Sequence, residues 1–164
     1  MAILRVSSTF ARPVDTAAYI ALDTIGNSTN AATIVSVAGG SPYPSEYGYI
    51  VKGQLETDQK TCTARIRVHL FNAAPTIIQD NSPYLKLFAN AGTRIGTIDF
   101  PALATEDPTN STGATAILTP GTGNLPLPFT LGADSTFYTL FETLDAFTPA
   151  SAQNFTLILG LDVL

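Results

Sequence analysis

The chain has 164 residues, of which 45% are hydrophobic and only 13% are charged, and its net charge at pH 7 is −5. The length fits one domain that folds without staples, and the single cysteine excludes an internal disulfide and any cysteine-based metal site. The acidic balance argues against nucleic acid and anionic membrane surfaces as partners, because both attract Lys and Arg.

The low share of charge also suggests what surrounds the protein. Soluble proteins carry roughly 25% charged residues, so this chain has about half the usual amount. A surface this poor in charge suggests that a partner, or copies of the same chain, cover much of it. No apolar run approaches the roughly 20 residues of a membrane-spanning helix, and Arg5 interrupts the apolar start that a signal peptide needs. We therefore expect synthesis in a cytoplasm.

The first half of the chain reads as strands separated by turns. Alternation from Ile3 to Phe10 places Leu4, Val6 and Phe10 on one face of a first strand, which ends at Arg12-Pro13. Three further strands are predicted, at Thr33–Val37, Gly48–Thr57 and Thr61–Phe71. In the strand Gly48–Thr57 we expect Tyr49, Val51 and Leu55 to share one face, with Lys52, Gln54 and Glu56 on the other. Residues 58–60 look like a tight connection, so the last two strands are predicted to form a hairpin.

The second half continues this pattern. An ordered loop is expected at 72–83, followed by a strand or one or two helical turns at 84–91 and a strand at 93–100. Residues 104–124 are mostly turn formers with one short strand at 114–119. Pro126 and Pro128 place the extended segment 125–131 at a sheet edge, because proline cannot donate to a ladder. The last strands are predicted at 135–144 and 154–163, the latter with an inward stripe of Phe155, Leu157, Leu159, Leu161 and Val163.

These elements define the predicted fold class. No segment has a long helical period, and about eight to ten short antiparallel strands with turns between them indicate a sandwich or barrel. The long excursions between some neighbours favour jelly-roll-like connections. We expect residues 1–164 to form a single all-β domain, in which residues 1–12 are either a strand or an N-terminal arm.

Reactive residues are sparse, so no enzyme activity, cofactor or metal site is predicted. His69 is the only histidine and lies on a strand face with Arg67, with no carboxylate visible nearby in sequence, so a structural role is favoured. Cys62 falls on the apolar face, where thiols are inert. The carboxylates are scattered and no glycosidase pair stands out. Tyr43, Tyr47 and Tyr49 cluster beside two prolines and are candidates for an interface or for stacking on sugars.

Several segments resemble one family of small tailed-bacteriophage virion proteins. The first is Phe-Ala-Arg-Pro-Val-Asp-Thr-Ala-Ala-Tyr at 10–19, and the second is His-Leu-Phe-Asn-Ala-Ala-Pro-Thr at 69–76 with Asp80-Asn81. Gly-Thr-Ile-Asp-Phe at 96–100 and Thr-Pro-Ala-Ser at 148–151 match as well. The matches run in order from about residue 9 onward, and residues 101–130, a variable loop region, have no counterpart.

The resemblance implies a capsid decoration (cement) protein, which binds the outer surface of the head and ties neighbouring major capsid protein subunits together. Such a protein is expected to be a homotrimer, with a dimer as the lesser option. The alternative is a head-fibre or tail-associated β module that binds host-surface glycans. The interface candidates are Leu4, Val6, Phe10, Arg12, Tyr43, Tyr47 and Tyr49. Arg12 is expected to pair with a carboxylate, and Asp15 to cap the turn that Pro13 begins.

Overall fold

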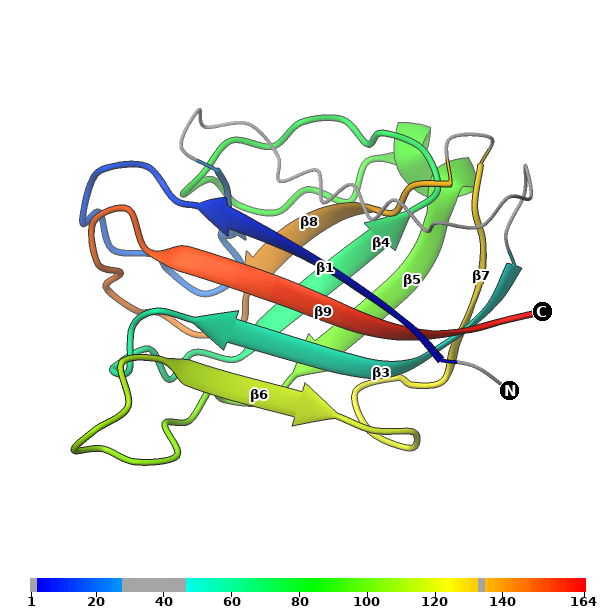
Figure 1. Ribbon diagram of the computed structural model, residues 1–164. Helices are drawn as coiled ribbons and strands as arrows, with labels where there is room; N and C mark the ends of the chain where they lie inside the picture. Colours follow the sequence, from blue (N-terminus) through cyan, green and yellow to red (C-terminus); the bar gives the residue numbers. More distant parts are fainter. Residues whose placement is uncertain (1–2, 28–46, 133–134) are drawn as a thin grey trace.

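The computed structural model describes residues 3–27, 47–132 and 135–164 as a sandwich of two antiparallel sheets (Figure 1). The predicted strand at Thr33–Val37 and the candidate Tyr43 lie outside these residues. The described elements are β1 (Ile3–Ala11), β2 (Thr24–Ile25), β3 (Tyr47–Thr57), β4 (Ile66–Phe71), a 3-10 helix η1 (Phe88–Thr93), β5 (Arg94–Phe100), β6 (Ala114–Leu118), β7 (Leu127–Thr130), β8 (Tyr138–Thr143) and β9 (Asn154–Val163). The all-β prediction is confirmed.

The order of the strands is that of a jelly roll. One sheet runs β1-β9-β3-β6, with β7 pairing the other end of β3, and the second runs β2-β8-β4-β5. When β7 is left out, eight strands remain, four in each sheet. Consecutive strands among these eight lie in opposite sheets, with β4 and β5 as the exception, and this is the double Greek-key pattern. Edge placement of β7 is confirmed, since β3 is its one partner among the described strands. No helix within the described ranges is long and apolar enough to span a membrane.

The predicted hairpin between residues 48–57 and 61–71 is wrong. β3 pairs with β9, β6 and β7, whereas β4 pairs with β5 and β8 in the opposite sheet. Residues 61–65 are irregular and carry the chain across the sandwich, so β4 begins at Ile66 rather than Thr61. Both strands have one apolar face, and these faces meet across the core instead of lying side by side.

A β-bulge corrects the expected faces of β3. The register with β9 shifts between Ile50 and Lys52, which leaves Val51 as an extra residue. Ile50 therefore points inward before the bulge and Leu55 points inward after it, although their positions differ in parity. Tyr49 lies on the outer face, so the prediction that it shares a face with Leu55 is wrong.

The core lies between the two sheets and uses the predicted inward residues. Phe155, Leu157, Leu159 and Leu161 of β9 are all buried, as are Ile66, Val68 and Leu70 of β4. Cys62 and Ala64 also face this core, before β4 begins. A second, smaller cluster of Phe71, Ile78 and Leu140 lies outside the four-stranded sheet, where the loop 72–87 packs against it. One sheet is thus covered on both sides.

Candidate functional site

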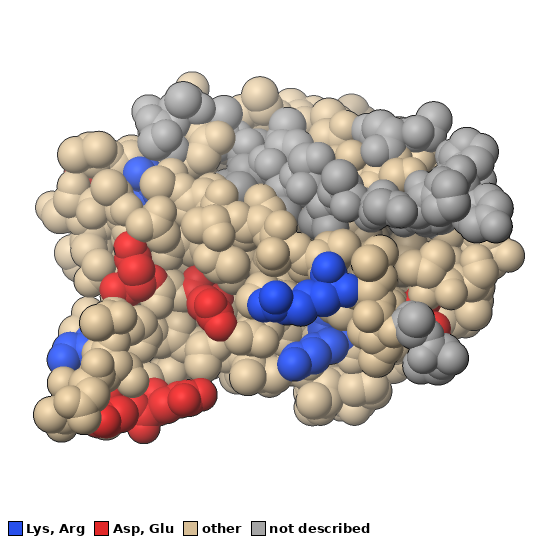
Figure 2. Space-filling view, in the orientation of Figure 1, with Lys and Arg blue, Asp and Glu red and all other residues tan. Residues whose placement is uncertain are grey.

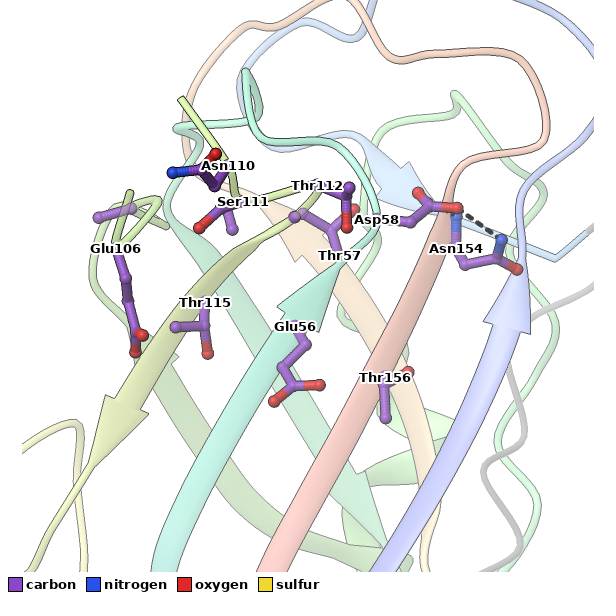
Figure 3. A pocket seen from close by; sticks show the side chains of 13 residues that line it. Glu56, Thr57, Asp58, Glu106, Asn110, Ser111, Thr112, Thr115, Asn154 and Thr156 are labelled. Atoms are coloured by element: carbon purple, nitrogen blue, oxygen red, sulfur yellow. Dashed lines mark hydrogen bonds between the residues drawn. The ribbon is translucent and has the colours of Figure 1, made fainter. Parts of the chain in front are cut away.

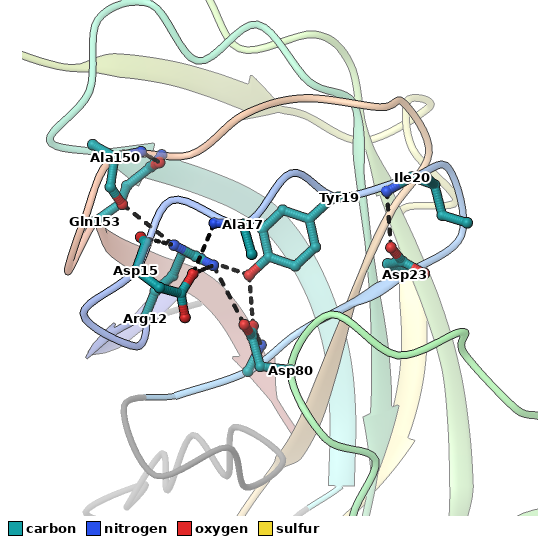
Figure 4. Close-up of polar contacts among 10 residues, drawn as sticks. Arg12, Asp15, Ala17, Tyr19, Ile20, Asp23, Asp80, Ala150 and Gln153 are labelled. Atoms are coloured by element: carbon teal, nitrogen blue, oxygen red, sulfur yellow. Dashed lines mark hydrogen bonds and ion pairs between the residues drawn. The ribbon is translucent and has the colours of Figure 1, made fainter.

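A buried polar network surrounds Arg12, directly after β1 (Figure 4). Its Nε donates to the Tyr19 hydroxyl at 2.6 Å, and its Nη2 reaches carboxylate oxygens of Asp15 at 3.2 Å and Asp80 at 3.3 Å. The Tyr19 hydroxyl donates to Asp80, and the Ala150 carbonyl accepts from Arg12 Nη1. Burial raises the pKa of Tyr19, so it stays a donor. All of these partners of Arg12 belong to its own chain.

This network answers two predictions from the sequence. Arg12 does pair with carboxylates, and the Asp15 carboxylate accepts from the Ala17 N–H at 3.0 Å, which closes the turn after Pro13. The same N–H lowers the pKa of Asp15. Arg12 is fully buried, however, so this candidate lies inside its own subunit rather than at an exposed interface.

A second polar cluster lies on the outer face of the four-stranded sheet. His69 Nε2 lies 2.8 Å from Glu142 Oε2, and Arg94 Nη2 lies 3.1 Å from His69 Nδ1. The Tyr84 ring stacks on the imidazole with the ring centroids 3.9 Å apart. Burial, with smaller effects of Arg94 and Arg67, lowers the pKa of His69 although Glu142 opposes this. Both ring nitrogens and one ring face are occupied, which agrees with a structural role.

Sequence reasoning missed Glu142 as the partner of His69. The two residues are 73 positions apart, on the neighbouring strands β4 and β8. The carboxylate was visible in the sequence, but the pairing of strands was not. Within the described part of the chain, no group of three or more His, Cys, Asp or Glu side chains is placed to hold a metal ion.

The outer face of the five-stranded sheet, called here the open face, presents side chains in rows across the strands. Its outward residues come from β1, β9, β3 and β6, which form the front layer in Figure 1. The ladder register sets the rows Ile3–Asp162–Tyr49, Arg5–Gly160–Lys52, Ser7–Ile158–Gln54–Ile117 and Thr9–Thr156–Glu56–Thr115. Most of these side chains are small or uncharged.

The few charges on the open face lie in different rows, with Arg5 and Lys52 between Asp162 on one side and Glu56 on the other. Figure 2 shows basic side chains in the middle of this face and acidic ones toward its left end. Arg5 and Lys52 flank Gly160, and neither forms an ion pair with a residue that the structure describes. Glu56 accepts a hydrogen bond from Gln54 Nε2 but likewise has no described basic partner. These charges are not neutralised within the described chain.

A polar cleft of about 580 Å³ opens at the acidic end of the open face (Figure 3). Glu56 and Thr156 form its floor from β3 and β9, and the loop after Ala104 with Glu106 forms one side. Asp58 accepts hydrogen bonds from the backbone N–H of Asn154 at 3.0 Å and from its side-chain amide at 2.7 Å. The lining has carboxylates, hydroxyls and amides, so it suits a polar or cationic group.

The remaining interface candidates are divided between the two sides of the sheet. β1 pairs with β9 of the same chain over its whole length, so Leu4, Val6 and Phe10 pack toward the core rather than forming a free arm. Among the described strands β9 is its one partner, and β1 lies at the sheet edge. Tyr47 and Tyr49 are 54% and 42% exposed and remain available to a partner.

Comparisons with known proteins add little to this geometry. No protein-family model and no curated protein matches the chain. Among solved structures, a family two carbohydrate esterase from Cellvibrio japonicus aligns with 90% of this chain and 36% of its own, at 17% identity and a TM-score of 0.14. A TM-score this low carries no argument about fold or activity.

Proposed function

We propose that this protein is a bacteriophage capsid decoration protein, which binds the outer surface of the head and stabilises contacts between major capsid protein subunits. The observation that carries the proposal is the convergence of three separate segments at Arg12. The segment 10–19 supplies Arg12, Asp15 and Tyr19, while Asp80 and Ala150 come from the two others. These are three of the four segments that resemble the phage virion family. If the resemblance were a coincidence, the matching segments would not be expected to contact one another in the structure.

The surface features support a protein that is covered by others. The loop 72–87 over the four-stranded sheet, together with the start of η1, exposes Ile77, Leu85 and Phe88, the last of them 94% exposed. Hydrogen bonds from the Thr76 backbone N–H and hydroxyl to Asn90 join the two ends of this segment. Exposed apolar side chains gathered on one segment are typical of protein-binding surfaces. We assign the capsid contact to this loop.

The test is binding to undecorated capsids. Wild-type protein should saturate the capsids and raise their resistance to heat, whereas Phe88→Ser should lower occupancy because the exposed ring no longer fills a pocket on the shell. Val14→Ser is the matched control, since Val14 is 82% exposed but belongs to the turn after β1. Failure of the wild-type protein to bind would overturn the function, and equal binding by Phe88→Ser would remove this loop as the contact.

A second candidate is a fibre-associated module that binds host glycans. The exposed rings of Tyr47 and Tyr49 favour it, because tyrosines stack on sugars. Two measurements separate the candidates. A copy number per virion close to that of the major capsid protein supports decoration, and binding to a panel of host glycans that is lost in the Tyr47→Ser/Tyr49→Ser double variant supports the fibre module.

A further inference from the structure

This inference depends on three alternate residues of β3, one basic, one uncharged and one acidic. Lys52, Gln54 and Glu56 follow the bulge and all point to the open face, while Gly53 and Leu55 point inward. Four residues of strand separate the Lys52 and Glu56 backbones by about 13 Å. The two charges therefore lie too far apart to pair with each other directly.

The spacing is symmetric about Gln54. A twofold axis in the plane of the face, perpendicular to β3 at Gln54, would bring Lys52 of each copy opposite Glu56 of the other. An isologous dimer requires this kind of self-complementary surface, because both subunits use the same residues. The Lys52–Glu56 pair would therefore form twice in one interface.

The row through Gln54 supplies the uncharged centre of such an interface. It contains Ser7, Ile158 and Ile117 beside Gln54. Ile117 is 49% exposed in the single chain, although it is a large apolar side chain. With the axis along this row, Ile117 of one copy lies near Ile117 of the other. An uncharged centre that contains an exposed apolar side chain, with charged residues on either side, agrees with the usual anatomy of a protein interface.

We propose that the open face is the self-association surface of this protein, and that a second copy packs on it face to face about a twofold axis at Gln54. The inference rests on the self-association included in the proposed function, but it names the surface and the symmetry. It favours a twofold contact over the threefold one that the family resemblance implies. The capsid-contacting loop over the other sheet stays free in this arrangement.

Sedimentation of the isolated protein and of charge variants tests the proposal. Lys52→Glu and Glu56→Lys each place like charges opposite one another at two symmetric contacts, so each should weaken the dimer at least about tenfold. The double variant Lys52→Glu/Glu56→Lys restores opposite charges with the sign exchanged and should recover the dimer. Lys86→Glu is the matched control, because Lys86 is exposed on the loop over the opposite sheet.

Ile117→Asp gives an independent check at the centre of the face and should also yield monomers. Circular dichroism of every variant establishes that the β fold is kept, as expected for outward positions. The proposal is overturned by a wild-type protein that sediments as a monomer or trimer. Single charge variants with unchanged mass, or a folded double variant that stays monomeric, would overturn it as well. None of these experiments uses capsids, so their failure is distinct from a failure of the decoration function.

Discussion

The outer faces of the two sheets differ in whether their charged residues form ion pairs. On the four-stranded sheet, Arg67 forms a bidentate pair with Asp99 at 2.7 and 3.0 Å, and Arg65 pairs with Asp145 at 2.7 Å. The Arg65 side chain lowers the pKa of Asp145 to about 2. On the open face, Lys52 and Glu56 have no such partners within the described residues.

This contrast separates a face that the subunit completes itself from one that it leaves incomplete. The loop 72–87 covers the four-stranded sheet through Ile78 and Tyr84, and buries His69 beneath them. On the open face, the cleft-forming loop lies at one end of the sheet. Charges that are satisfied internally stabilise the fold, and charges that are not are available to a partner.

Leu157→Asp and Leu159→Asp should unfold the protein. Both side chains point into the core between the sheets, and an unpaired buried carboxylate costs several kcal/mol, against a total stability of about 5–15 kcal/mol for a domain. Ile158→Asp should cost less, about 1–3 kcal/mol. Although Ile158 is only 6% exposed, it points to the open face and not into the core between the sheets. Urea denaturation measures the difference. Equal loss of folded protein in all three variants would show that the open face is as dry as the core.

Arg12→Met should destabilise the protein by about 3–5 kcal/mol, because it leaves the Asp80 carboxylate buried without its cation. Asp80 would still accept from Tyr19 and from the Gly26 N–H, which limits the loss. Arg5→Met on the open face is the control and should change stability by less than about 0.5 kcal/mol. Similar losses for the two variants would contradict the contrast between completed and incomplete regions.

Glu142→Ala should cost about 1–3 kcal/mol, since it removes the acceptor for buried His69. Glu56→Ala, at a carboxylate without a basic partner on the open face, should be nearly neutral for the stability of the subunit. Chemical denaturation of both variants at one protein concentration provides the comparison. A larger loss for Glu56→Ala would mean that the open face stabilises the subunit more than its contacts indicate.

A weak pH dependence should originate from His69. Burial lowers its pKa in the folded protein, so the unfolded chain, with an ordinary value of about 6.5, binds the proton more readily. The stabilising contribution is complete above that pH and is lost as the pH falls toward the lowered folded value. The melting temperatures of wild type and His69→Gln should therefore approach each other as the pH is lowered from neutral to mildly acidic. Parallel curves would show that other groups cause the pH dependence.

Alternation in the sequence predicted which side chains face the core but not which strands are neighbours. The stripe from Phe155 to Leu161 and the proline-bearing edge strand were correct, because period and backbone chemistry are local properties. The hairpin between β3 and β4 was wrong, because a pair of strands with one apolar face each can lie side by side or face each other. The extra residue Val51 reversed the predicted faces of β3 at Tyr49 and Ile50, before the bulge, without any signal from glycine or proline, whereas Leu55 after the bulge points inward as predicted.

The candidate site was predictable to a similar extent. The pairing of Arg12 with a carboxylate and the role of Asp15 followed from local turn chemistry. The contribution of Asp80 required knowledge of contacts 68 residues apart, which a single sequence does not provide. Alternation did place Lys52, Gln54 and Glu56 on the face opposite Leu55, as the structure has them, but the neighbours of these residues in the sheet could not be predicted from it.

The pairing of β1 with β9 also has a consequence for biosynthesis. Ile3 lies opposite Asp162, so β1 finds its partner only after the other described strands have been made. Until then Leu4, Val6 and Phe10 have no sheet to pack on, and pairing over so long a stretch of chain is slow. Folding of this domain should therefore be completed only after β9 has been made. The interval before β9 emerges is the period in which the nascent chain is most exposed to aggregation through its edge strand.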